Sequence, residues 1–102
     1  MILKINTADP KLVKVELIFG GKVVRSLTQE NKFGSQVLLP MIVKILASQE
    51  VVLQDVSEIR VNTGPGSYTG LRVGASIAQA LAFALNIPVN GQLNKTPQLS
   101  YT

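Results

Sequence analysis

The sequence predicts an α/β fold: one mixed five-stranded sheet and two helices, in the order β-β-β-α-β-α-β. Three observations support this prediction. The N-terminal third holds short β-branched runs, two of them separated by a Gly-Gly pair that is typical of a hairpin. Two longer segments are apolar with helical spacing. After the hairpin meander, strands and helices alternate, which predicts a right-handed βαβ crossover and a mixed sheet with its helices on one face.

The first three strands are expected to form a meander. Residues 2–5 form the first strand, and a turn at 7–10 follows it, where Pro10 interrupts regular structure. The run 12–19 alternates in its first half and is rich in β-formers. The Gly20-Gly21 pair then turns the chain into the third strand, residues 22–28.

The first helix is expected over residues 35–48. Ser35 or Asn31 is the candidate N-cap. Pro40 lies inside the pattern, so either the helix is kinked there or its regular part begins near Leu39. The segment 49–55 has two possible interpretations, a short apolar connector or a frayed helix end.

The remaining elements follow a glycine-rich turn. Residues 57–62 are expected to form the fourth strand, residues 69–85 the second helix and residues 87–89 a brief fifth strand. We therefore expect one lobe over residues 1–90, followed by a loosely held polar tail over 91–102.

Composition excludes several classes of function. The 102 residues suit a single domain, and 46% of them are hydrophobic with a mean hydropathy of +0.29. That is apolar for so small a monomer, so part of the surface is expected to be covered by a partner. The chain has no cysteine and no histidine, which removes disulfides, thiolate nucleophiles and the commonest general base and metal ligand.

The charges and the N-terminus point to a cytoplasmic protein without a membrane partner. The net charge is +4, but the ten Lys and Arg residues are scattered and only five aromatic residues accompany them. We therefore expect no dedicated RNA-reading surface and no sequence-specific nucleic-acid binding. The apolar run at the N-terminus is too short, and is followed too early by polar residues, for a signal peptide. No stretch reaches the roughly 20 apolar residues that span a bilayer.

The glycine turn has two interpretations. Gly64, Gly66 and Gly70 are spaced G-x-G-x-x-x-G, one residue too long for the dinucleotide fingerprint, and no P-loop lysine follows. The first interpretation is a tight strand-to-helix turn, capped by Ser67 or Thr69. The second is an anion site in which the helix N-terminus binds a phosphate with help from Arg72.

Both helices have almost no polar face. In the second, Arg72, Ser76 and Gln79 form the only polar stripe. A row of small residues, Gly70, Gly74, Ala78 and Ala82, allows another backbone to approach closely. The helices either pack only on their own sheet or meet a second helical layer from another chain, which is the favoured interpretation. The predicted partner interface comprises Leu38, Leu39, Ile42, Ile45, Gly70, Leu71, Gly74, Ile77, Ala78, Leu81 and Ala82.

The segment Gly64-Pro65-Gly66-Ser67-Tyr68-Thr69-Gly70-Leu71-Arg72-Val73-Gly74 resembles the signature of the TsaB family, also called YeaZ. Two shorter segments, Gly34-Ser35-Gln36-Val37-Leu38-Leu39-Pro40 and Leu3-Lys4-Ile5-Asn6-Thr7, are partial matches to the same family. The resemblance covers only the first of the family's two lobes, so the chain is expected to be either truncated or a minimal natural version.

The resemblance implies a single lobe of the actin-like, RNase H-like superfold. It implies a non-catalytic subunit of the machinery that makes threonylcarbamoyladenosine on tRNA. Its implied partners are a catalytic TsaD-like subunit, a TsaE-like ATPase and, when alone, a second copy in a homodimer. Two departures matter: Asn6 replaces the aspartate of the superfold's phosphate motif, and Gly34 replaces a family histidine.

Two alternatives remain beside this interpretation. One is a phosphate- or nucleotide-binding enzyme that uses the loop from Gly64 to Gly70 and Asp9. The other is a diverged lobe that only associates with itself. The chain has no His or Cys to act as a nucleophile or general base, and it has no P-loop lysine. We therefore expect no catalytic residue, no cofactor and no metal site.

Overall fold

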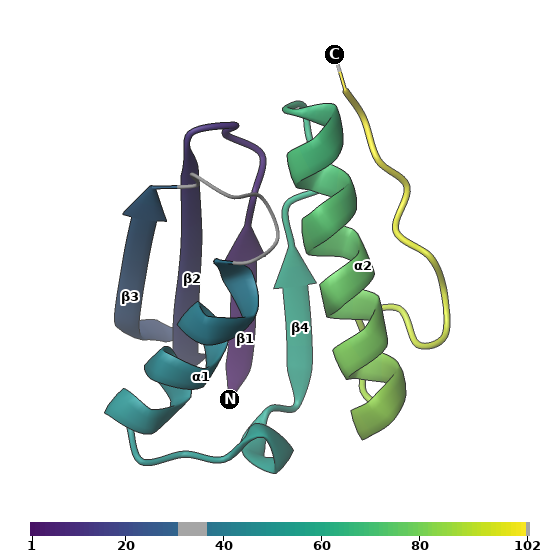
Figure 1. The fold of residues 1–102 in the computed structure, drawn as a ribbon. Helices are drawn as coiled ribbons and strands as arrows, with labels where there is room; N and C mark the ends of the chain where they lie inside the picture. The colour runs from purple at the N-terminus through teal and green to yellow at the C-terminus, as the bar shows by residue number, and fades with distance from the viewer. Residues whose placement is uncertain (31–36, 102) are drawn as a thin grey trace.

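The structure is a computed structural model that describes residues 1–30 and 37–101. The elements of this part of the chain alternate between sheet and helix after an N-terminal β-meander (Figure 1). They are β1 (Ile2–Asn6), β2 (Leu12–Phe19), β3 (Lys22–Glu30), α1 (Leu38–Ser48), the short 3₁₀ helix η2 (Leu53–Asp55), β4 (Glu58–Val61) and α2 (Tyr68–Leu85).

The sheet has the strand order β3-β2-β1-β4. The first three strands are antiparallel, and β4 pairs in parallel with β1, so the predicted mixed sheet and crossover are confirmed. Gly20 and Gly21 both have positive φ, at 61° and 78°, which glycine adopts without steric cost. They form the predicted hairpin between β2 and β3.

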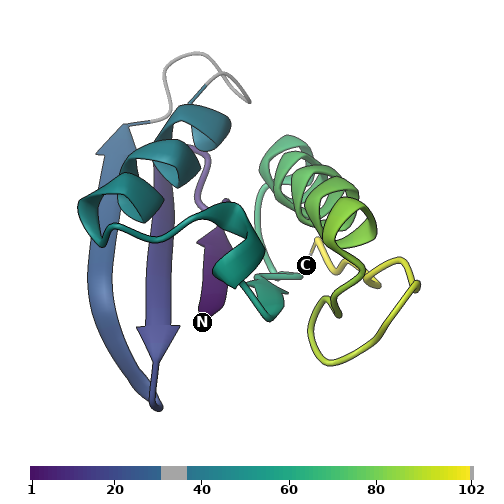
Figure 2. The same ribbon diagram turned by 90° about the horizontal axis from the view of Figure 1, so that it is seen from below.

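Both helices cover the same face of the sheet and lie side by side, with α1 over the meander and α2 beside β4 (Figure 2). Alternate residues of the strands point into this layer, as a period of two requires. No helix within the described ranges is long and apolar enough to cross a membrane. The largest fully buried apolar side chains are Leu3, Ile5, Val13, Val15, Leu17, Leu38, Ile45, Ile59 and Leu71.

The predicted fifth strand is wrong: the described sheet has four strands. Val89 makes only isolated bridges to Ile59 and Gln92. The side chain of Asn90 makes the hydrogen bonds to Val61 that the backbone of a longer strand would make. Its amide accepts from the Val61 N–H at 2.9 Å and donates to the Val61 carbonyl at 3.1 Å. Asn90 itself has a φ of 50°, which turns the chain away from the sheet edge.

Several element bounds also differ from expectation. β3 continues to Glu30, and the ambiguous segment after α1 contains the one-turn helix η2. α1 begins at Leu38, so Pro40 lies in its first turn. N–H groups in the first turn have no partner within the helix, so the N–H that proline lacks costs no helical hydrogen bond. The cap candidates Ser35 and Asn31 lie outside the described residues.

The C-terminal segment, residues 91–101, is hydrogen-bonded to the lobe. It runs back along α2 toward the glycine turn (Figures 1 and 2). Gln79 of α2 donates to Thr96 at 2.9 Å, and the Ser100 N–H donates to the Thr63 carbonyl at 2.8 Å. The segment therefore covers the flank of α2 that faces away from α1.

Candidate docking face

The small-residue row of α2 faces the chain's own sheet. Gly70 and Gly74 lie against Thr7, and a Cβ on either glycine would overlap Thr7 atoms. The Thr7 hydroxyl donates to the Gly70 carbonyl at 2.5 Å, which ties the first turn of α2 to the end of β1. The row therefore lets α2 pack closely on its own lobe and is not open to a partner.

This corrects most of the predicted partner interface. The burial of these residues inside one chain means that they form its core and cannot at the same time line its surface. The mistake has a physical origin: a small-residue row permits close backbone approach but does not say whose backbone approaches. The buried positions are Leu38, Ile42, Ile45, Gly70, Leu71, Gly74, Ala78 and Ala82, whereas Ile77 and Leu81 are half-buried and Leu39 is exposed.

Apart from Tyr68, Arg72 and Phe83, which is 81% exposed, the outer side of α2 presents small and medium-sized side chains. At 3.6 residues per turn these positions lie opposite or beside the sheet-facing row. Thr69, Val73, Ser76 and Ile77 line a shallow, open pocket of about 410 Å³. The residues on this side are Thr69, Val73, Ser76, Ile77 and Ala80, of which Val73 and Ile77 are half-buried and the others exposed.

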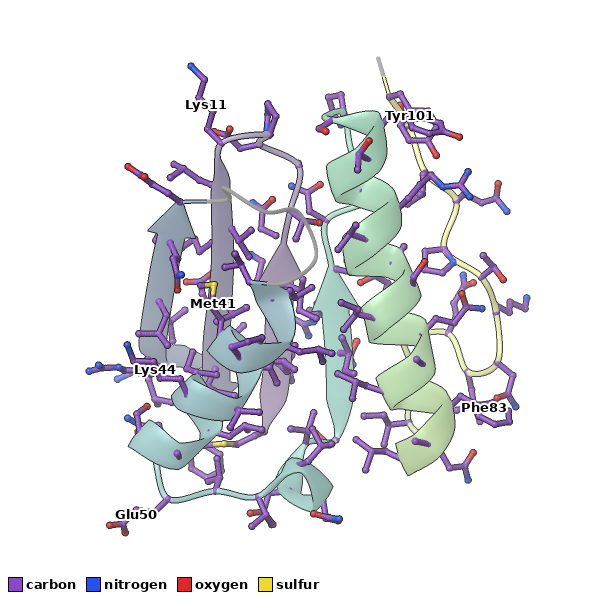
Figure 3. All side chains as sticks on the ribbon, viewed as in Figure 1. Lys11, Met41, Lys44, Glu50, Phe83 and Tyr101 are labelled. Carbon is purple, nitrogen blue, oxygen red and sulfur yellow. The ribbon has the colours of Figure 1, made fainter. Side chains whose placement is uncertain are left out.

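The outer side of α1 is apolar. Leu39 is 48% exposed and Val43 is 67% exposed, although both are large hydrophobic residues. Lys44 points away from α2 (Figure 3). Leu39 and Val43 lie on the other flank of the same helix, because successive residues are about 100° apart. They therefore point toward α2 and outward.

The two outer sides join across a pocket of about 330 Å³ between the first turns of the helices. Leu38 of α1 and Thr69 and Val73 of α2 are among its lining residues. We call the combined surface the helical face and define it as Leu39, Val43, Thr69, Val73, Ser76, Ile77 and Ala80.

The predicted interface contained only two residues of the helical face, Leu39 and Ile77. The sequence did hold one signal for the rest: the polar stripe of Arg72 and Ser76 marks the outward side of α2. Nothing in the pattern of α1 distinguished exposed Val43 from buried Ile42.

Charge on the two helices is sparse and of one sign. Lys44 and Arg72 are their only charged residues, and neither helix contains Asp or Glu. Arg72 donates from Nη1 to the Tyr68 hydroxyl at 2.8 Å and lies 5.2 Å from the centre of the Tyr68 ring. Tyr101 of the C-terminal segment packs on Tyr68 with 4.7 Å between ring centroids. The helical face thus has a cation at each side.

Three N–H groups of the glycine turn donate to acceptors within the chain. The Gly64 N–H donates to the Asn62 side chain at 2.9 Å, and the Ser67 N–H donates to the Ala8 carbonyl at 2.8 Å. The Gly70 N–H donates to Ser67 Oγ at 3.2 Å, so Ser67 is the N-cap of α2. These bonds support the tight-turn interpretation, since a phosphate cradle needs free, convergent donors.

The residues proposed for nucleotide chemistry are also engaged locally. Asn6 Oδ1 accepts from the Ala8 N–H at 3.1 Å and from Asn62 Nδ2 at 3.2 Å. Asp9 Oδ1 accepts from the Lys11 N–H at 2.7 Å in an exposed turn. Over residues 1–30 and 37–101, no three His, Cys, Asp or Glu side chains gather closely enough to hold a metal ion.

Comparison with known proteins places this fold and turn in a family. The model of the family TsaD, tRNA N6-adenosine threonylcarbamoyltransferase, matches residues 23–91. The tRNA threonylcarbamoyladenosine biosynthesis protein TsaB of Haemophilus influenzae is 40% identical over 88 residues, which are 86% of this chain and 37% of that protein. TsaB of Escherichia coli K12 is 40% identical over 90 residues, which cover 88% and 38%.

The solved structure of YeaZ from Pseudomonas aeruginosa is similar, with a TM-score of 0.79 and 34% sequence identity. The match covers 86% of this chain and 42% of YeaZ. The chain therefore spans well under half the length of the relatives it matches. Since the family model covers more than half of the chain and these relatives agree with it, the chain belongs to the TsaD family and, within it, to the TsaB (YeaZ) proteins.

Proposed function

We propose that this chain is a non-catalytic interaction module of the tRNA threonylcarbamoyladenosine machinery, which binds a TsaD-like subunit through the helical face. The observation that carries the proposal is the exposure of Leu39 and Val43 beside the small outer side of α2. The relatives named TsaB supply the biological setting.

The chemistry of the helical face suits a pair of helices from another chain. Apolar side chains on α1 supply area that loses contact with water on binding, at about 25 cal/mol per Å². Thr69, Ser76 and Ala80 have short side chains, so a partner helix can approach the backbone of α2 closely at these positions. Exposed apolar surface on neighbouring helices is the usual mark of a docking site.

A catalytic role has less support. In the turn from Gly64 to Gly70, the N–H groups of Gly64, Ser67 and Gly70 are bonded within the chain, and Asn6 is bonded to its neighbours. General acid–base or nucleophilic chemistry needs groups that this chain lacks, because it has no His and no Cys. We therefore place the chain's role in assembly and not in the chemical step.

The test is calorimetric titration of the purified chain with the TsaD-type subunit of the same organism. Val43→Glu places a charge in the middle of the helical face without disturbing the core, because Val43 is 67% exposed. It is expected to abolish binding while leaving the circular dichroism spectrum unchanged. The matched control is Val52→Glu, at a position 59% exposed but outside the helical face, which should bind like the parent chain.

Failure of the parent chain to bind at high micromolar concentration would remove this proposal. Equal loss of binding in both variants would show that the contact lies elsewhere. A second copy is the other candidate occupant of the helical face when the chain is alone, and sedimentation of the Val43→Glu variant tests whether any self-association uses the same surface.

A further inference from the structure

We propose that Arg72 is the charged anchor of the helical face and receives a carboxylate from a helix of the partner. The helical face would then select a chain with acidic residues on its docking helices over a second copy of this chain. This inference rests on the proposed function and adds to it the chemistry by which the partner is chosen.

Arg72 is held in place by Tyr68, and a second tyrosine packs against Tyr68. Its Nη1 donates to the Tyr68 hydroxyl at 2.8 Å, and its guanidinium lies 5.2 Å from the centre of the same ring. Tyr68 in turn packs against Tyr101 at 4.7 Å. An arginine oriented in this way loses less side-chain entropy when it binds a carboxylate. The C-terminal segment therefore has a positioning role toward the docking surface.

Arg72 keeps free hydrogen-bonding capacity. A guanidinium carries five N–H donors, and one of them is used by Tyr68. Within the described part of the chain, no carboxylate forms an ion pair with Arg72; the pairs found there are Lys14–Glu16 and Arg60–Glu58 on the opposite side of the sheet. The remaining donors are available for a bidentate contact.

The pocket beside Arg72 is built for an acidic side chain. Thr69 and Ser76 line the same open pocket and carry hydroxyls that can donate to a second carboxylate oxygen. Val73 and Ile77 form its apolar side and would contact the methylene groups of a glutamate or aspartate. The arginine, the two hydroxyls and the apolar side chains are therefore adjacent on consecutive turns of α2.

A second copy cannot supply the carboxylate from its own helical face. Both helices lack Asp and Glu, and their charged residues are Lys44 and Arg72. In a symmetric pair, the same surface meets itself, so four cations and no anion would border the contact. Like charges at an interface oppose association, whereas a partner with acidic helices removes this repulsion and gains the pair.

The experiment measures the affinity of the intact chain for the TsaD-type subunit of the same organism at low and at high salt. Arg72→Gln should weaken binding by about tenfold and remove most of its salt dependence. Arg72→Lys keeps the charge but not the planar fork, and should recover only part of the loss. Arg25→Gln, at an exposed position on β3, is the matched control and should behave like the parent chain.

Tyr101→Ala tests the positioning role. It should weaken binding by a smaller factor, and should have little further effect in the Arg72→Gln background, because the tyrosine acts through the arginine. The same arginine variant should self-associate more strongly than the parent chain, since a repulsive charge has been removed.

The outcomes separate the two proposals. If the parent chain binds and Arg72→Gln binds equally well, the anchor is wrong and the proposed function stands. If Arg72→Gln weakens self-association, a second copy supplies the acceptor and the selectivity argument is overturned. If the parent chain does not bind at all, the proposed function fails and the anchor fails with it.

Discussion

The hydroxyl of Thr7 occupies the space that a Cβ at Gly74 would need. This contact joins the end of β1 to the second turn of α2 and sets how closely the helix lies on the sheet. Both partners are buried, so neither can move aside into solvent.

Gly74→Ala is therefore expected to destabilise the fold. Overpacking of a closely packed core costs about 1–3 kcal/mol, and the better helix propensity of alanine returns up to about 1 kcal/mol. We expect a net loss of about 1–2 kcal/mol in the free energy of unfolding. Urea denaturation measures it, and a midpoint equal to that of the parent chain would contradict the close contact.

Thr7→Ala supplies the matched test of the same contact. Alone, it removes the hydroxyl that bonds to Gly70 and should destabilise by about 1 kcal/mol. Combined with Gly74→Ala, it removes the overlapping atom, so the double variant should be more stable than the sum of the two losses predicts. Simple additivity would mean that the two residues are not coupled.

Ala78→Arg is expected to unfold the chain. Ala78 is 0% exposed in the core between α2 and the sheet, and an arginine there would bury an unpaired charge. Ala80→Arg, two residues along the same helix but exposed, should fold normally and lose only partner binding. Circular dichroism separates these results; a folded Ala78→Arg monomer would show that this position is a surface position after all.

Asn90→Ala is expected to loosen the edge of the sheet at β4. The substitution removes both side-chain hydrogen bonds to Val61 and replaces Asn, which tolerates a φ of 50° better than most residues, with Ala. We expect a loss of about 1–3 kcal/mol and faster hydrogen exchange at the Val61 amide. Asn94→Ala is the control, because Asn94 also has a positive φ but lies on the exposed C-terminal segment.

The chain alone is expected to show no ATP turnover. It has no histidine or cysteine, and Asp9 accepts a hydrogen bond from its own turn. A coupled phosphate-release assay with magnesium checks this. Turnover that persists through purification and disappears in Asp9→Ala would instead support the nucleotide-binding alternative.

The sequence by itself determined the first four strands, the two longer helices and their order. Alternation in β1, β2 and β4, the Gly20-Gly21 hairpin and the apolar spacing of two helices are local properties, and local sterics and periodicity are enough to read them. The glycine turn was also readable from Ser67 as a helix cap. The family resemblance rested on that same contiguous segment.

The tertiary structure alone decided which helix surface is core and which is available. α2 has two rows of small residues, one through Gly74 and Ala78 and one through Ser76 and Ala80, and both permit a close neighbour. Only the position of Thr7 shows that the first row meets the sheet. The missing fifth strand has the same kind of cause, because the side chain of Asn90 competes for the hydrogen bonds that a strand would make, and that competition depends on where the chain returns in space.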